Sequence, residues 1–219
     1  MTLARPIRSI ALLLAVIAPA AADIIDRIAV SVGSQVITTS DIDREIRVLA
    51  FLSNSKPDFS PANRRATADR MVEQKLIRHE LETARYPTPN PSLIDPALAD
   101  MVAKQFHGDA AYRSALAAAG ITDQDVRDEL LWQHTLLAFV DDRFRPAVQI
   151  SDQDVQNYFD RVVEPAALAA HPGEPPKLDD YRDQVVKTLT GQRADEEMDR
   201  WLKEARARTA IVYHEEVFR

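Results

Sequence analysis

The sequence predicts a mainly α-helical fold with a small antiparallel β-sheet, and three observations support this prediction. Residues 28–32 alternate as a strand with one buried face does, Gly33-Ser34 falls where a two-residue hairpin turn would, and residues 35–38 return the chain. A short apolar run, residues 210–213, lies near the other end of the chain. Between these segments, apolar residues recur with helical spacing. Because an isolated hairpin cannot bury its apolar face in water, we expect the run at 210–213 to complete the sheet.

The first 22 residues are typical of a secretory signal peptide. Arg5 and Arg8 make a basic start, an apolar run follows, and three alanines at 20–22 form a small-residue cleavage site. The apolar run is shorter than the roughly 20 residues that cross a bilayer. We therefore expect cleavage near Asp23 and a periplasmic location for the mature chain.

Net charge and cysteine content argue against several classes of function. Without the two arginines of the leader, 25 of the 27 basic residues remain against 34 acidic ones, so the mature chain has a formal net charge of −9. Such an acidic chain binds nucleic acid and anionic lipid poorly. No second apolar run is long enough for stable membrane insertion. The chain has no cysteine, which excludes thiol chemistry.

The first strand and the first helix have clear local signals. Ile28, Val30 and Val32 are spaced to face the core from one side of a strand. Ser40 is predicted to be the N-cap of the first helix, with Asp43 at the reciprocal position of a capping box.

Later helix boundaries are marked by hydroxyl caps, glycines and prolines. Further helices are predicted at residues 60–85, 98–107, 109–120, 123–145, 152–163 and 178–207. Two of them begin with the same layout, Thr122 with Asp125 and Ser151 with Asp154, which predicts two capping boxes. The proline-rich segment 87–96 is expected to be irregular, and 165–177 is read as a linker rich in proline, alanine and glycine.

No set of residues is typical of an active site. The chain lacks a glycine-rich phosphate loop and a G-x-S-x-G elbow, and its five histidines lack the spacing of metal ligands. Paired acids such as Asp152 and Asp154 stand at helix starts, where they complement the helix dipole. We therefore expect a protein that is not an enzyme and that needs no metal or cofactor.

Large apolar side chains on the predicted helices are more numerous than one core stripe requires. Core packing explains most such residues, but methionines and aromatic side chains also suit a groove that accepts varied polypeptides. The candidate peptide-binding residues are Met71, Met101, Phe106, Tyr112, Trp132, Phe139, Tyr158 and Phe159.

Several stretches resemble the SurA-type periplasmic chaperones. They are IIDRIAVSVGSQVITTSDIDREI (24–46), ATADRMVEQKLIRHELETAR (66–85), FHGDAAYRSALAAAGITDQDVRDELLWQ (106–133), ISDQDVQNYFD (150–160) and LDDYRDQVVKTLTGQRADEEMDRWLKEARARTAIVY (178–213). Their order, rather than any single motif, carries the resemblance. It covers nearly all of the mature chain.

The resemblance implies a fold and a domain organisation. It implies a SurA/trigger-factor-like helical chaperone domain in which residues 178–219 return to complete the domain begun by 23–164. Many members of the family carry parvulin-type prolyl isomerase domains between these two parts. Here the short segment 165–177 stands in that place, too short for a domain of about a hundred residues. Isomerase activity is therefore not expected.

The resemblance also implies a function, which is the binding of unfolded polypeptides or outer-membrane protein precursors as a holdase. A dedicated structural or assembly subunit of an envelope complex is the alternative, and the sequence alone separates the two poorly. The missing insert argues against a third hypothesis, a divergent prolyl isomerase. Swapping of the C-terminal helix across the linker would give a homodimer, which stays open at this stage.

Overall fold

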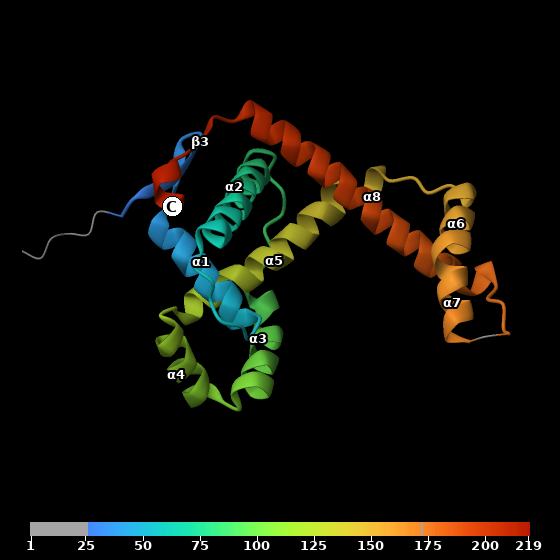
Figure 1. The fold of residues 1–219 in the computed structure, drawn as a ribbon, viewed down its shortest axis with the longest axis horizontal. Coiled ribbons are helices and arrows are strands. Elements are labelled where there is room, and N and C mark those ends of the chain that lie inside the picture. Colours follow the sequence, from blue (N-terminus) through green and yellow to red (C-terminus); the bar gives the residue numbers. More distant parts are fainter. Residues whose placement is uncertain (1–25, 172) are drawn as a thin grey trace, which may run out of the picture.

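The protein is described by a computed structural model that covers residues 26–171 and 173–219 (Figure 1). In chain order its strands and α-helices are β1 (Ile28–Val32), β2 (Gln35–Thr38), α1 (Thr39–Leu52), α2 (Pro61–Thr83), α3 (Asp95–Met101), α4 (Asp109–Ala119), α5 (Asp123–Arg143), α6 (Asp152–Tyr158), α7 (Glu164–Ala170), α8 (Leu178–Arg208) and β3 (Ile211–Tyr213). Shorter 3₁₀ turns occur at Pro91–Ile94, Arg145–Ala147 and Glu215–Phe218, and π-helical turns at Val102–Phe106 and Phe159–Val163.

The three strands form one antiparallel sheet in the order β2-β1-β3, so the first and last strands of the described chain are neighbours. Val32 of β1 pairs with Gln35 of β2 on one side and with Ile211 of β3 on the other. Gly33 makes the hairpin turn with a φ of +58°, and its N–H donates to the carbonyl oxygen of Ala210 at 2.8 Å. The predicted fold class, mainly α with a small sheet built from both ends of the chain, is confirmed.

Three buried clusters join the helices. The first lies between the sheet, α1, α2 and the end of α8; the second joins α2, α5 and α8; the third joins α1, α3, α4 and α5. Their central residues include Val30, Ile37 and Val72 in the first, Ile77 and Phe139 in the second, and Val48 and Val126 in the third. Burial of each such side chain contributes about 1.5–3 kcal/mol. The packing of α1, α2 and α5 in shared clusters makes these helices the body of the molecule.

Helix α8 connects this body to a small lobe that contains α6 and α7 (Figure 1). Its C-terminal half packs on α2 and α5, with Leu202 in their shared cluster. Its N-terminal half carries the lobe, where the rings of Tyr181 and Phe159 lie 6.2 Å apart. Arg193 Nη2 also lies 2.8 Å from Asp154 Oδ1 at the start of α6. One long helix therefore holds both parts.

The predicted burial pattern of β1 is wrong at its first residue. Ile28 is 44% exposed, whereas Ala29 and Val30 are both fully buried. The register with β2 shifts between Ile28 and Val30, and such an irregularity breaks the two-residue alternation of side chains. The buried face of the strand therefore includes Ala29, which the alternation placed outside.

The predicted cap of α1 is wrong by two residues. Thr38, not Ser40, is the N-cap: its side-chain oxygen accepts from the Asp41 N–H, and Asp41 accepts from the Thr38 N–H. Thr38 is also the last residue of β2, so the chain passes from strand to helix without a loop. The capping boxes predicted at Thr122 and Ser151 are confirmed.

The segment predicted as a linker, residues 165–177, is partly helical, because α7 runs through Glu164–Ala170. Pro165 falls in the first turn of this helix, where the missing N–H of proline has no carbonyl to bond. The alanines that follow are strong helix formers. The prolines after residue 171 come too late to prevent the helix.

The predicted signal peptide, residues 1–22, lies outside the described residues. Among the helices of residues 26–171 and 173–219, none is both long enough and apolar enough to cross a membrane.

Candidate functional site

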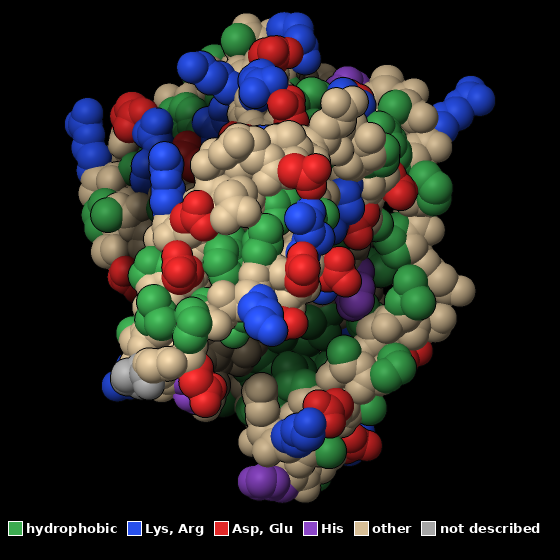
Figure 2. Space-filling model, turned by 90° about the vertical axis from the view of Figure 1, so that its right-hand side faces the viewer, with side chains coloured by type: hydrophobic (Ala, Val, Ile, Leu, Met, Phe, Trp, Pro, Cys, Tyr) green, Lys and Arg blue, Asp and Glu red, His purple; other side chains and the backbone are tan. Residues whose placement is uncertain are grey.

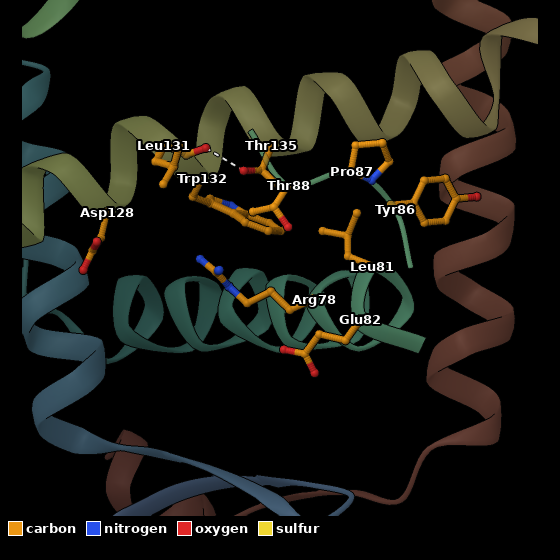
Figure 3. A pocket seen from close by; sticks show the side chains of 10 residues that line it. All are labelled: Arg78, Leu81, Glu82, Tyr86, Pro87, Thr88, Asp128, Leu131, Trp132 and Thr135. Atoms are coloured by element: carbon orange, nitrogen blue, oxygen red, sulfur yellow. Dashed lines mark hydrogen bonds between the residues drawn. The ribbon is translucent and has the colours of Figure 1, made fainter. Parts of the chain in front are cut away.

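A cavity of about 580 Å³ lies between α2, α5 and the loop that follows α2 (Figure 3). We call it the α2–α5 groove. Its lining residues are Arg78, Leu81, Glu82, Tyr86, Pro87, Thr88, Asp128, Leu131, Trp132 and Thr135. The volume is within the range of about 300–1,000 Å³ that is common for ligand pockets.

The end of α2 shapes one wall of this groove. Ala84 is the C-cap, and Arg85 takes a left-handed conformation with a φ of +56°. The N–H of Tyr86 then donates to the carbonyl oxygen of Leu81 at 3.0 Å, the long bond of a Schellman motif. This motif commonly brings the two bonded residues into apolar contact. Tyr86 and Leu81 are both partly buried against the second cluster, and together they form an apolar wall.

Trp132 of α5 lies opposite that wall. Its side chain is only 5% exposed, and the guanidinium of Arg78 lies over its ring, 4.4 Å from the centroid. In Figure 3 Arg78 reaches from α2 toward Trp132, while Glu82 and Asp128 point away from the ring. The cation–π contact holds Arg78 across the opening. The groove thus combines apolar walls with charges of both signs at its edge.

A smaller cavity of about 170 Å³ adjoins the groove and shares Arg78 and Asp128 with it. Five carboxylates line it, and two of them, Glu45 of α1 and Glu129 of α5, have raised pKa values. Burial, together with the charge of Glu129, raises the pKa of Glu45 to about 7. Burial also raises the pKa of Glu129. Near neutral pH, therefore, Glu45 is protonated in part of the molecules.

Neither Glu45 nor Glu129 forms an ion pair within the described part of the chain, and both interact with amides instead. Gln133 Nε2 donates to Glu129 Oε1 at 2.9 Å, and Gln74 Nε2 lies 3.5 Å from Glu45 Oε1. Within residues 26–171 and 173–219, no three histidines, aspartates or glutamates converge as metal ligands.

The structure separates the eight candidate residues of the sequence instead of gathering them in one groove. Trp132 lines the α2–α5 groove, Met71 the small acidic cavity, Phe106 a pocket beside α4, and Tyr112 a hollow between α3, α4 and α5.

The other four candidates lie elsewhere. Phe139 is 1% exposed inside the second cluster, and Met101 packs against the third. Tyr158 and Phe159 belong to the small lobe, where Phe159 is buried. Helices that contact several neighbours bury aromatic side chains on more than one face, which is why large size alone did not identify a surface.

Sequence reasoning missed Arg78, Leu81, Tyr86 and Leu131. Two signals for them were present. A proline just beyond the last turn of a helix, as Pro87 is here, is typical of a Schellman end. In such an end the residue before the proline folds back onto the last turn of the helix. Arg78 lies on a strongly charged stretch of α2, but an arginine side chain is long enough to reach an aromatic ring on a neighbouring helix.

The surface at the end of the molecule that carries α6 and α7 is mixed in character (Figure 2). Acidic and basic side chains are interspersed there, and hydrophobic side chains gather in a hollow in the lower half of the view. Exposed apolar residues of this lobe and of the adjoining half of α8 include Val162, Leu168 and Val186.

Comparison with known proteins does not assign the sequence to a family. No protein-family model matches the sequence, and a search of curated proteins finds no significant match. The resemblance to SurA-type chaperones therefore stays a prediction.

Proposed function

We propose that the protein is a periplasmic chaperone of the holdase type, which binds unfolded polypeptides such as outer-membrane protein precursors and has no prolyl isomerase activity. The observation that carries this proposal is the α2–α5 groove, with Leu81, Tyr86 and Trp132 as apolar walls and charges of both signs at its edge. Such a surface suits varied apolar segments with polar neighbours. The resemblance of the sequence to SurA-type chaperones supports the same proposal.

The mechanism needs no nucleotide. An apolar side chain of an unfolded client would leave water by contacting Leu81, Leu131 and Trp132, at about 25 cal/mol for each Å² of apolar surface buried. Ordering of the client opposes this gain. Binding is therefore weak at each contact and reversible, as a holdase requires.

Aggregation suppression tests the proposal. An outer-membrane β-barrel protein is diluted from urea with and without the full mature chain, and light scattering is recorded. Leu131→Ser removes an apolar side chain from the groove, whereas Leu137→Ser on the same helix changes a residue that is 64% exposed and does not line it. We expect suppression near stoichiometric amounts, weakened several-fold by L131S and unchanged by L137S. If L131S and L137S weaken suppression equally, the groove is not the binding site. If the parent protein does not suppress aggregation, it is not a general holdase.

A dedicated subunit of an envelope complex is the second candidate function. The exposed apolar residues Val162, Leu168 and Val186 on the small lobe and the adjoining part of α8 favour it, because a docking surface for one partner would contain such side chains. A pull-down from envelope extract separates the two functions. One stoichiometric partner, lost in Leu168→Ser and absent from binding assays with unfolded chains, would support this candidate instead.

A divergent prolyl isomerase and a homodimer with swapped C-terminal helices are checked on the same sample. We expect no acceleration of cis–trans exchange in a proline peptide, because the segment 165–177 is too short for a parvulin domain. Light scattering on a size-exclusion column gives the mass and so distinguishes a monomer from a swapped dimer. Cell fractionation of the full chain tests export and the periplasmic location.

A further inference from the structure

A second apolar pocket, about 520 Å³ in volume, lies between the end of α1, the loop at residues 53–60 and α4. We call it the α1–α4 pocket. Phe51, Phe59 and Phe106 are its aromatic lining, and Ala115 and Ala118 of α4 form a wall of small side chains. This pocket shares none of its lining residues with the α2–α5 groove.

The backbone explains why these rings surround an open space. Helix α1 ends with Asn54 in a left-handed conformation, φ +50°, and the Ser55 N–H donates to the Ala50 carbonyl oxygen at 2.8 Å. This Schellman end turns the following loop back alongside α1. On the other side, the π-helical turn Val102–Phe106 presents Phe106, whose ring stacks on Phe51 with centroids 5.1 Å apart. Rings and backbone are therefore held in place by the fold.

The α1–α4 pocket has one charged lining residue, Arg47. Its guanidinium lies 5.5 Å from the centroid of the Phe59 ring. Nearby Arg64 pairs with Asp43 at 2.9 Å, and Arg44 lies 3.9 Å from Asp125, but Arg47 forms no ion pair within the described part of the chain. An unpaired guanidinium beside an apolar pocket is complementary to a carboxylate attached to an apolar group. The chain has a formal net charge of −7, so an unpaired positive charge stands out against the rest of the molecule.

We propose that the α1–α4 pocket binds an extended client segment in which an apolar side chain and an acidic side chain lie two residues apart. The proposal rests on the proposed function, because it assumes an unfolded polypeptide as ligand. Side chains two residues apart in an extended chain point to the same side, about 7 Å from each other. Arg47 and Phe51 are one helical turn apart on α1, a similar spacing of about 6 Å. The apolar side chain packs against the stacked rings of Phe51 and Phe106, the carboxylate meets Arg47, and the alanines of α4 let the client backbone approach.

A double-mutant cycle between protein and peptide tests this inference. The probe is a fluorescent, acetylated and amidated peptide with an internal Phe-Ser-Glu sequence, and its partner carries Phe-Ser-Gln; fluorescence anisotropy gives the Kd for each. The variants are Arg47→Gln, and Arg113→Gln as a matched control, since Arg113 is an exposed arginine of α4 that does not line the pocket. A third variant, Ala118→Glu, places an acid at an exposed lining position.

We expect the Glu peptide to bind the parent protein and R113Q about two- to fivefold more tightly than the Gln peptide, as for a partly exposed ion pair. That preference should vanish in R47Q and reverse in A118E. An unchanged preference in R47Q, or no binding of the Glu peptide to the parent protein, would overturn the inference. If a peptide that ends in a free Phe carboxylate binds more tightly than the Glu peptide, the inference is also wrong. The pocket would then capture the C-terminal end of a chain.

The outcome is distinguishable from failure of the proposed function. Suppression of aggregation that depends on Leu131 would survive loss of the α1–α4 pocket, because the two cavities have no lining residue in common. If the protein suppresses no aggregation and binds neither peptide, the proposed function itself is wrong.

Discussion

Glu45 and Glu129 place two carboxylates at the junction of α1, α2 and α5. Other charged residues around them are Asp41 and Arg44 of α1, Arg70 and Arg78 of α2, and Asp125 and Asp128 of α5. The pKa of Glu45 is raised first by burial and next by the charge of Glu129, while Arg70 and Arg78 oppose the shift. Removing a carboxylate from water without an ion-pair partner destabilises its charged form.

The stability of the protein should therefore fall as pH rises through the acidic range. Between the ordinary pKa of 4.5 and about 7, the folded protein keeps a proton on Glu45 that the unfolded chain has released. Because the folded state then binds more protons, the free energy of unfolding decreases with pH over this window and levels off above it. The total loss is up to about 3 kcal/mol, from the size of the shift.

Glu45→Gln should flatten this profile, because glutamine resembles the protonated side chain and cannot ionise. We expect E45Q to match the parent near pH 4.5 and to exceed it in stability at pH 8, as measured by urea denaturation at several pH values. Glu196→Gln, at an exposed position of α8, is the control and should leave the profile unchanged. Parallel profiles for E45Q and the parent would show that Glu45 is not the titrating group.

Arg78 connects this acidic cavity with the α2–α5 groove, since it lines both. Arg78→Gln removes a positive charge that lowers the pKa of both carboxylates, and it also removes the cation–π contact with Trp132. We expect R78Q to destabilise the fold by about 1 kcal/mol at pH 5, from the lost contact, and by more at pH 8, where the carboxylates are charged. Arg161→Gln, at an exposed arginine of the small lobe, should have little effect at either pH. If R78Q lowers the free energy of unfolding equally at both pH values, Arg78 does not stabilise the charged forms of Glu45 and Glu129.

At the scale of elements, the passage from β2 to α1 depends on the cap at Thr38. Thr38→Ala removes the oxygen that accepts from Asp41, and loss of such a cap costs about 1 kcal/mol. Ser40→Ala removes an exposed hydroxyl that donates to Asp26 and is no part of the cap, and it should cost less. Thermal or urea unfolding of the two variants measures the difference. No measurable loss in T38A would show that this cap does not stabilise the helix.

Element boundaries with one strong local signal were predictable, and those with two competing signals were not. Thr122 and Ser151 each stand alone before an acid three residues later, and both boxes form as predicted. Around α1, Thr38–Asp41 and Ser40–Asp43 overlap, and the local pattern does not say where β2 ends. The hairpin and its pairing with β3 were predictable because few other apolar segments had strand character.

The candidate site was less predictable than the fold, because a groove depends on which faces of several helices meet. Phe139 and Trp132 are seven residues apart on α5 and share one cluster, yet only Trp132 lines a groove. Which of them borders the groove depends on the Schellman end of α2, where Arg85 takes a conformation that is unusual for a residue other than glycine. Nothing in the spacing of apolar residues specifies that geometry.

At the scale of the whole molecule, α8 is the element through which the lobe and the body are connected. Its 31 residues span about 46 Å at 1.5 Å per residue. Gly191 lies between Tyr181, which contacts the lobe, and Leu202, which packs in the body. A glycine inside a helix costs about 1 kcal/mol relative to alanine. The connecting helix is therefore weakest near the point where the two parts meet.

Gly191→Ala should stabilise the protein by about 0.5–1 kcal/mol, because an added Cβ would meet no atom within 4 Å and the unfolded chain would lose conformational freedom. Gly120→Ala is the matched control. Its Cβ would also meet nothing within 4 Å, but Gly120 has a φ of +67°, so the same methyl group should destabilise the protein by about 1 kcal/mol. Urea denaturation followed by circular dichroism measures both changes. Opposite signs would show that backbone conformation, rather than packing, decides the effect at these open positions, whereas destabilisation by G191A would contradict an open helical site at residue 191. Neither position lines the α2–α5 groove, so aggregation suppression by G191A should equal that of the parent protein.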